Sequence, residues 1–512
     1  MSDPRSTLVL ALTLALLPSL ASAQEMSASQ AIEAALEAYP GYQAAAIQVR
    51  MSRDHVRAEE AHYQLVLHLE GNANLGSQPG ITGQLGGTIT MPTITPVVII
   101  PYAERINLIA ELQRSFDTGT LIALRTTGYR QLARQSTSAG AAQLFTYGPG
   151  YGIDVSLTVT QPFLRGFGSD VGAADLHAAR IDLHAQEAAR DLRASELVRD
   201  VLSNYAELWY AQQSVRINTG SRDLAQRLEA DAQGRVDVGT LAGADVLQFA
   251  TRVASMEEAV ALAEVDRRSR ALALATLLSG AGAAARSIGT GSGMETSVAD
   301  LPVVSAPPGD SEAVQLAMDR SPQIAQLEAQ IEAARQQAQI ATQAIMPRLD
   351  AQAQVAFHGL GLDDVGAAFQ QVGTIAAVTA LFSLIYETPL EDTRLHAEEE
   401  RASLQIDAAE AQLAEARLTI TQQIETLVQQ RQAARRRIEL AEGTVSIAQR
   451  TIEATEGHVQ IGSAQVQQLL DAQEQERQAQ LRLARARTDL VVADTTLASL
   501  TGRLLDDVVL PE

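Results

Sequence analysis

The chain of 512 residues lacks cysteine altogether, and since it also lacks lysine, its 39 basic residues are all arginine. The absence of cysteine excludes disulfide bonds, thiolate metal sites, cysteine nucleophiles and an acylated cysteine anchor. Aromatic residues make up only 4% of the chain, although 46% of it is hydrophobic. The 61 acidic residues give a net charge of −22, which argues against binding to nucleic acid, because phosphates would be repelled.

The first 23 residues have the pattern of a secretory signal peptide. Arg5 supplies a positive charge, residues 8–17 form a short apolar run, and Ala21-Ser22-Ala23 is a small-residue cleavage site. An uncleaved membrane anchor is the alternative, which is disfavoured because the run is too short to span a bilayer. We therefore expect signal peptide 1–23 to be removed, and the mature chain to begin near Gln24 and to leave the cytoplasm.

Two distant stretches of the chain are similar, which indicates an internal duplication. Residues 29–40 align without a gap with residues 311–322, and both stretches end in proline. Three glycines recur at one constant offset: Gly220, Gly234 and Gly239 correspond to Gly443, Gly457 and Gly462. We predict a first repeat over 24–280, a linker rich in glycine, alanine, serine and proline over 281–310, and a second repeat over 311–512.

The first repeat contains an insertion. Its segment from Pro40 to Pro162 is much longer than the matching segment from Pro322 to Pro389, and the additional residues fall around 76–135. Within them, two runs on either side of Asp117-Thr118-Gly119 have the composition of strands, which predicts an added β-hairpin. A surface loop or a plug is the alternative.

Each repeat is predicted to contain a helix, two extended strands and two longer helices. The opening helices cover about 27–63 and 311–346. Apolar and polar residues alternate over 153–160 and 349–358, which is the period of a strand with two different faces. Both runs have about the length of a tilted transmembrane strand. The stretch 374–388 is more uniformly apolar and therefore less decisive.

The longest helical patterns cover about 169–233 and 391–456, the first of them after the N-cap candidates Ser169 and Asp170. At 1.5 Å per residue, such a helix would extend roughly 100 Å. Apolar residues recur every seven positions, which is the period of a coiled coil: Ile406, Leu413, Ile420 and Leu427. Hairpins of this length need neighbouring hairpins or subunits to cover their apolar seams, and strands in lipid must close a barrel.

With these features the chain resembles the TolC-type outer-membrane efflux proteins (outer membrane factors) over nearly its whole mature length. The resemblance is carried by the duplicated opening helix with its proline, by TQPFLRGFG at 160–168, and by two turn motifs. The turn motifs are VGTLAGADVLQ at 238–248 and IGSAQVQQLLD at 461–471. Their order, duplication and spacing indicate the family, although no single motif is specific.

The resemblance implies a mainly α fold with a membrane β-barrel part. Three identical chains would form one outer-membrane barrel and a long periplasmic α-helical barrel, in the outer membrane of a Gram-negative bacterium. It also implies a passive exit duct of a tripartite efflux pump or a type I secretion system. A periplasmic adaptor (membrane fusion protein) would join the duct to an inner-membrane transporter. If the inserted hairpin joined the barrel, six strands per chain would give 18 strands instead of the family's usual 12.

The resemblance also gives roles to residues near the two turns. The helical tips of the family meet the adaptor, and the docking positions in this chain are Gly239, Thr240, Gly462 and Ser463. Acidic residues just beyond the second turn line the periplasmic aperture in the family, where this chain has Asp471 and, in place of a usual aspartate, Gln468. Asp245 in the first repeat would contribute further charge. The alternative for the glycines is that they serve only to reverse the chain.

No pattern typical of catalysis, cofactor binding or metal binding is present. His177 and His184 lie seven residues apart on one helix but lack a supporting carboxylate motif, so a solvated helix face is the preferred interpretation. The single Trp209 is expected to pack between helices. We expect neither an enzyme nor a nucleic-acid-binding protein.

The competing interpretation is a non-conducting periplasmic coiled-coil adaptor or scaffold, which would lack lipid-facing strands in both repeats. The charge of −22 per chain predicts a cation-preferring pore, provided that acidic groups face the lumen. Neither the exported cargo nor the particular transporter follows from the sequence.

Overall fold

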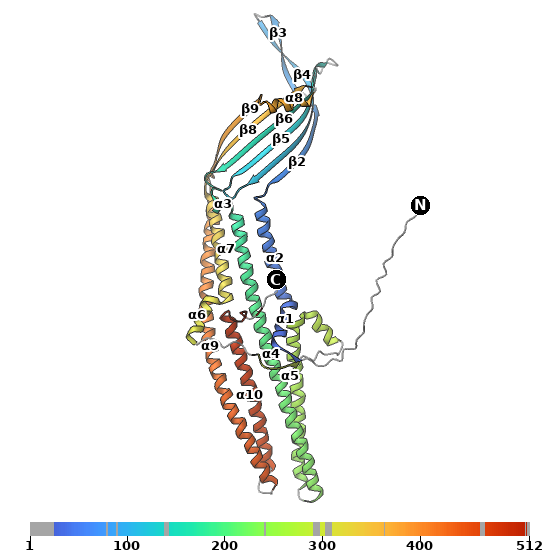
Figure 1. Cartoon of the computed structure of the whole chain (residues 1–512), viewed down its shortest axis with the longest axis vertical. Coiled ribbons are helices and arrows are strands. Elements are labelled where there is room, and N and C mark those ends of the chain that lie inside the picture. The colour runs from blue at the N-terminus through green and yellow to red at the C-terminus, as the bar shows by residue number, and fades with distance from the viewer. Residues whose placement is uncertain are drawn as a thin grey trace, which may run out of the picture. The chain divides into compact units, whose positions relative to one another are not determined.

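A computed structural model describes residues 25–77, 80–88, 91–137, 143–239, 242–289, 297–302, 310–362, 364–460, 466–506 and 508. They form two compact units (Figure 1). The helical unit comprises the described residues up to Ala46, 190–324 and those from 416 onward, and the sheet unit comprises 47–189 and 325–415. The predicted signal peptide lies outside the described residues.

Helices and strands follow one another in a similar order in the two halves of the chain. The first half contains α1 (Ala28–Ala38), α2 (Pro40–Ala61), α3 (Ser169–Gly172), α4 (Ala174–Asp237) and α5 (Gly243–Gly289). The second contains α6 (Asp310–Arg320), α7 (Pro322–Ile345), α8 (Val365–Gly373), α9 (Thr393–Gln460) and α10 (Val466–Leu500). Helix α5 continues nine residues into the segment expected to be a linker. The division into repeats at 24–280 and 311–512 stays a prediction.

Each opening helix consists of two helices, whereas the sequence predicted one. Ser27 begins α1 with a capping box, in which its side chain and that of Gln30 bond each other's backbone N–H. Tyr39 then ends α1 in an extended conformation, with φ −75° and ψ 116°. The ring of Pro40 disfavours a helical conformation at the residue before it. The same break occurs before Pro322, where α6 ends and α7 begins.

The two longest helices agree in length with their prediction, with 64 residues in α4 and 68 in α9. Of the heptad residues in α9, Leu413 and Ile420 are buried, as the coiled-coil period requires. The start of the first long helix differs from the prediction. Ser169 lies inside the short helix α3, which Gly168 precedes, and α4 begins only at Ala174.

The helical unit has a core at the level of α1. Tyr42, Tyr205 and Leu208 are almost fully buried in it, together with Leu274 of α5. The hydroxyl of Tyr205 donates a hydrogen bond to the carbonyl oxygen of Met26, at 2.8 Å. Trp209 packs against this core, as predicted. Among the residues that the structure describes, no helix is both long enough and apolar enough to cross a bilayer.

The sheet unit is built on an antiparallel sheet in the order β2-β4-β5-β6-β8-β9, with β3 also paired to β4. Its strands are β2 (Val66–Ser77), β3 (Gly80–Thr88), β4 (Met91–Ser115), β5 (Leu121–Thr137), β6 (Gln143–Pro162), β8 (Arg348–Leu362) and β9 (Val378–Glu387). The insertion therefore forms the predicted hairpin, β4–β5, and this hairpin is part of the sheet. Two residue pairs also join β1 (Glu25–Met26) to β7 (Ser297–Val298) in the helical unit.

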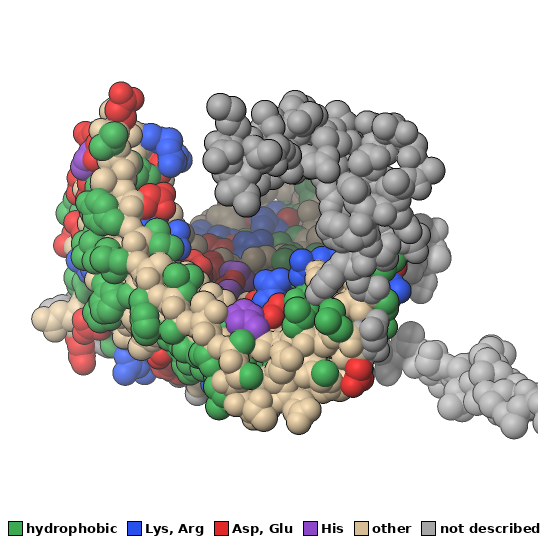
Figure 2. Space-filling model, turned by 90° about the horizontal axis from the view of Figure 1, so that it is seen from above, with side chains coloured by type: hydrophobic (Ala, Val, Ile, Leu, Met, Phe, Trp, Pro, Cys, Tyr) green, Lys and Arg blue, Asp and Glu red, His purple; other side chains and the backbone are tan. Residues whose placement is uncertain are grey.

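The sheet has one apolar and one polar face. Residues paired directly across strands point to the same face. One row across all six strands is entirely apolar: Leu67, Leu112, Leu124, Leu157, Val355 and Ala380. The adjacent row points the other way and is mostly polar: His68, Glu111, Arg125, Ser156, Ala356 and Thr379. Charged and histidine side chains gather in the hollow seen from above in Figure 2.

Helix α8, which the sequence did not predict, covers β8 where β9 no longer pairs with it. The ladder between β8 and β9 ends at the pair Phe357 and Val378. Beyond it, the side chain of Gln371 accepts from the backbone N–H of Leu360 at 3.0 Å and donates to its carbonyl oxygen at 2.8 Å. Asp364 begins α8, because its carboxylate accepts from the N–H of Gly366 at 2.9 Å.

Candidate functional site

The ends of the two helical hairpins contain the residues for which the sequence predicted a role. Gly239 follows α4 with φ +74°, a left-handed conformation that glycine adopts without strain. Its N–H bonds the carbonyl oxygen of Val236 at 2.9 Å and so ends the helix. Thr240, Gly462 and Ser463 lie outside the described residues. The structure thus describes one of the four predicted docking residues, as a turn.

A groove of about 440 Å³ lies between α5 and α10 near these ends. It is lined by Leu247, Gln248, Thr251, Arg252, Ser255, Gln467, Leu470, Asp471 and Glu474. The predicted aperture residue Asp471 is therefore in this groove, and its carboxylate accepts a hydrogen bond from Gln467 at 3.0 Å. Gln468 is exposed and is not in the lining. The side chain of Asp245 is outside the described part of the chain.

One carboxylate, that of Glu474, joins the hairpins at this groove. Glu474 of α10 accepts from Arg252 of α5 at 2.6 Å and from Nε of Arg477 at 2.9 Å. Arg477 also donates to the side chain of Asn218 on α4, at 2.8 Å. Apolar packing accompanies this cluster, since Ala232, Phe249 and Leu470 of the same three helices are buried together. Four polar residues thus fix three helices at the groove.

The cluster sets the ionisation of Glu474. Burial opposes the charged form, but hydrogen bonds from Arg477, Arg252 and Gln478 outweigh it and lower the pKa of Glu474 from 4.5 to about 2. A carboxylate whose pKa is lower in the folded protein stabilises the fold above its unfolded pKa. That contribution is lost as the pH falls from about 4.5 towards 2.

We therefore expect acid to loosen the hairpin ends. The shift corresponds to about 2 kcal/mol, after a reduction for the partial exposure of the side chain. The measurement is urea unfolding of the detergent-solubilised protein between pH 6 and pH 2.5, for the native chain and for Glu474→Gln. The difference in the free energy of unfolding between the native chain and Glu474→Gln should become smaller as the pH is lowered. A difference that is independent of pH would contradict the assignment.

Sequence reasoning missed Arg252, Glu474, Arg477 and Asn218. Arg252 and Glu474 are 222 residues apart in the chain, so no local pattern connects them. The spacing of Glu474, Arg477 and Gln478 on one helical face was the available signal, because residues three and four apart are neighbours there. It did not reveal the two helices that complete the cluster.

The polar face of the sheet is a second candidate site. Asn107 donates to Asn72 at 2.6 Å, and Arg105 lies over the ring of Tyr129, 4.3 Å from its centroid. Further along the sheet, His358 contacts Asp154 at 2.8 Å. Such a hydrogen-bonded polar surface suits a water-filled lumen, whereas the opposite apolar face suits lipid.

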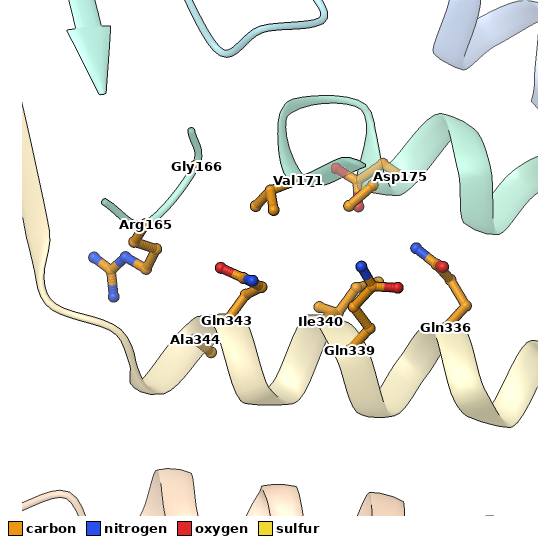
Figure 3. A pocket seen from close by; sticks show the side chains of 10 residues that line it. Arg165, Gly166, Val171, Asp175, Gln336, Gln339, Ile340, Gln343 and Ala344 are labelled. Carbon is orange, nitrogen blue, oxygen red and sulfur yellow. The ribbon is translucent and has the colours of Figure 1, made fainter. Parts of the chain in front are cut away.

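A smaller open groove of about 260 Å³ lies at the helix-side end of the sheet (Figure 3). Gln336, Gln339 and Gln343 extend into it from α7, opposite Val171 and Asp175. The lining is mixed: beside the three glutamines it contains apolar residues and the charged Arg165 and Asp175, so it does not indicate a particular ligand. In the described part of the chain, no group of histidine, aspartate and glutamate side chains is arranged to hold a metal ion.

The comparisons with known proteins agree with this architecture. Residues 313–503 match the family model "Outer membrane efflux protein". No curated protein matches the chain at the required significance. Among solved structures, VceC of Vibrio cholerae is 18% identical with a TM-score of 0.61, and the match covers 93% of this chain and 96% of VceC.

Two further outer-membrane channels are similar in the same way. CmeC of Campylobacter jejuni is 12% identical with a TM-score of 0.61, covering 93% of this chain and 86% of CmeC. The open state of MtrE of Neisseria gonorrhoeae is 15% identical with a TM-score of 0.59, covering 93% and 89%. At such identities these likenesses concern the fold.

The family match supports an outer-membrane efflux channel and an outer-membrane location, and a transport family supports the expectation that the chain is not an enzyme. The predicted fold class, mainly α with a β part, agrees with the solved channels. The resemblance to TolC-type outer-membrane efflux proteins predicted from the sequence is therefore confirmed, by the family match in the second half of the chain and by the fold along most of its length.

Proposed function

We propose that the chain is a passive duct that assembles as a homotrimer in the outer membrane and works in a tripartite efflux pump or a type I secretion system. The observation that carries the proposal is the two-faced sheet. An apolar row and a polar row run side by side across all six strands, from Leu67 and His68 on β2 to Thr379 and Ala380 on β9. A sheet with water on both sides rarely exposes an apolar face of this extent, which is typical of contact with lipid or with another protein.

The sheet also requires partners. In the described residues, β2 and β9 are the two ends of the strand order. An open strand edge in lipid leaves backbone N–H and C=O groups unpaired, so the sheet must close through further copies. This requirement favours the duct over the competing hypothesis of a periplasmic adaptor or scaffold.

The helical ends would connect the duct to its partners. We propose that a periplasmic adaptor contacts the turns at Gly239, Thr240, Gly462 and Ser463 and couples the duct to an inner-membrane transporter. In the same proposal Asp245, Gln468 and Asp471 line the periplasmic aperture. The position of Asp471 in an open groove at the hairpin ends is compatible with this role.

Planar-bilayer recordings of the detergent-purified protein, with its mass determined in parallel, test the proposal. We expect stable conductance steps from a trimer, with a preference for cations because of the net charge of −22 per chain. Equal permeability to both ion signs would contradict an acidic lumen. A monomer that never enters the bilayer would contradict the duct and favour the scaffold.

A further inference from the structure

The inserted hairpin β4–β5 is an integral part of the sheet. On one side, residues 102–113 of β4 pair with all of β2. On the other side, β5 pairs with β6, beginning with Leu121 opposite Thr160. The hairpin therefore lies between β2 and β6, and removing it would separate them. It is neither a surface loop nor a plug inside the sheet.

Near its turn, the hairpin has the same two faces as the other strands; farther from the turn, Glu104 and Arg130 form an ion pair at 2.6 Å on the side of the apolar row. Leu112 and Leu124 belong to the apolar row, and Glu111 and Arg125 belong to the polar row. Leu108, in the part of β4 that pairs with β2, has 68% of its surface exposed on the apolar face. Because side chains alternate along a strand, both faces of the hairpin are in register with those of the whole sheet.

Side-chain contacts tie the hairpin to its neighbours at both borders. Asn107 of β4 donates to Asn72 of β2 at 2.6 Å on the polar face. At the turn, the hydroxyl of Thr120 donates to the amide oxygen of Gln161 on β6, at 2.5 Å. The turn also lies close to the backbone of the segment that follows β6, since a Cβ at Gly119 would lie 2.2 Å from the carbonyl oxygen of Gly166. The hairpin thus contacts β2 on one side and the end of β6 with the segment after it on the other.

The two end strands are suited to each other. All five ladders along the path from β2 to β9 are antiparallel, so these two end strands of the six run in opposite directions. Strand β9 of one copy can therefore pair with β2 of the next in the same antiparallel manner. The strands are of similar length, with 12 residues in β2 and 10 in β9.

We infer that three copies of this chain close an 18-stranded barrel through pairing of β9 with β2 of the next copy, and that the inserted hairpin supplies a third of its wall. This inference depends on the trimer of the proposed function. Barrel diameter grows roughly linearly with strand number, so the barrel is about 1.5 times as wide as a 12-stranded one. Barrels of 16–18 strands enclose an aqueous channel. Arg105, Glu111 and Arg125 of the hairpin then line that channel.

Single-cysteine labelling tests this wall directly, because the native chain has no cysteine. We would place Asn107→Cys on the polar face of β4 and Leu108→Cys on its apolar face, in trimers reconstituted into phospholipid vesicles. A charged, membrane-impermeant maleimide should label the first variant and fail to label the second. Asn72→Cys and Leu69→Cys on β2 form the matched pair outside the insertion and should behave alike. Equal labelling of the two β4 variants would overturn the inference.

The junction between copies needs its own measurement. Pairs of cysteines that combine position 70 or 72 of β2 with position 381 or 383 of β9 scan the registers on the polar face. At least one pair should give a covalent trimer on oxidation. The absence of any cross-link in an intact trimer would overturn the junction.

Images of the purified trimer along its axis measure the width of the barrel. They should show a ring about 1.5 times as wide as that of a 12-stranded barrel. A ring of 12-stranded width would overturn the inference even in a conducting trimer. A protein that is not a trimer, or does not conduct, would contradict the proposed function instead, so the two failures are distinguishable.

Discussion

The Gly119→Val variant is expected to lose more than about 3 kcal/mol of folding stability, since a strained backbone conformation alone costs about 1–3 kcal/mol. Gly119 has φ +82°, which a β-branched residue adopts only with strain. A Cβ there would also lie 2.2 Å from the carbonyl oxygen of Gly166, so that the backbone of one of the two segments would have to shift. The turn of β4–β5 would therefore leave its place beside the end of β6.

The midpoint of urea unfolding in detergent, together with the yield of trimer, measures this effect. Gly128→Ala is the matched control on the same hairpin, because the nearest atom to a Cβ at that position is 4.0 Å away. The control should have the same midpoint of urea unfolding as the native protein. If Gly119→Val had the same midpoint too, the hairpin would not be docked where the sheet has it.

The Glu474→Gln variant is expected to destabilise the hairpin ends by about 2–4 kcal/mol at neutral pH, because removal of one partner leaves charged groups without compensation. Arg252 and Arg477, whose side chains are only 17% and 16% exposed, would both lose the carboxylate that pairs with them. The glutamine keeps the size of the side chain, so packing is preserved. The loss should appear as faster hydrogen exchange in residues 467–478 and in the facing part of α5.

A variant at a nearby glutamate is the control that distinguishes loss of the Glu474 cluster from the general loss of one negative charge. Glu476 lies on the same helix and accepts a hydrogen bond from the neutral side chain of Gln480 at 3.0 Å. Glu476→Gln should therefore increase the rate of hydrogen exchange by less than Glu474→Gln does. Equal changes in hydrogen exchange for the two variants would mean that the cluster contributes nothing specific. The Arg252→Gln variant should reproduce a large part of the change in hydrogen exchange that Glu474→Gln causes.

Local patterns in the sequence predicted most elements of the fold. Alternation at 153–160 and 349–358 marked β6 and β8, and the heptads marked α9, because both signals depend on neighbours within one element. The break at Pro40 was missed, although proline restricts the residue before it. Helix α8 was also missed, since nine residues, four of them glycine or glutamine, offer too few turns for a period to stand out.

The candidate site was less accessible from the sequence. Gly239 was identified as a turn, because glycine with a positive φ is typical of helix ends. The contacts around Glu474 combine residues of three helices, and only the folded chain brings Asn218 and Arg477 to 2.8 Å. Likewise, the composition of β4 and β5 indicated a hairpin, but its place between β2 and β6 depends on long-range pairing that no local pattern contains.

The bond pair between Gln371 and Leu360 bears on how newly exported chains avoid aggregation. Unpaired strand edges invite strand exchange with foreign chains. Beyond the ladder with β9, the edge of β8 would be such a place, but the amide of Gln371 occupies both backbone groups of Leu360. If copies assemble as proposed, a chain that has folded alone would offer β2 and β9 to its other copies, while this stretch of β8 is already blocked. One glutamine would then help a folding intermediate to distinguish its own copies from unrelated strands.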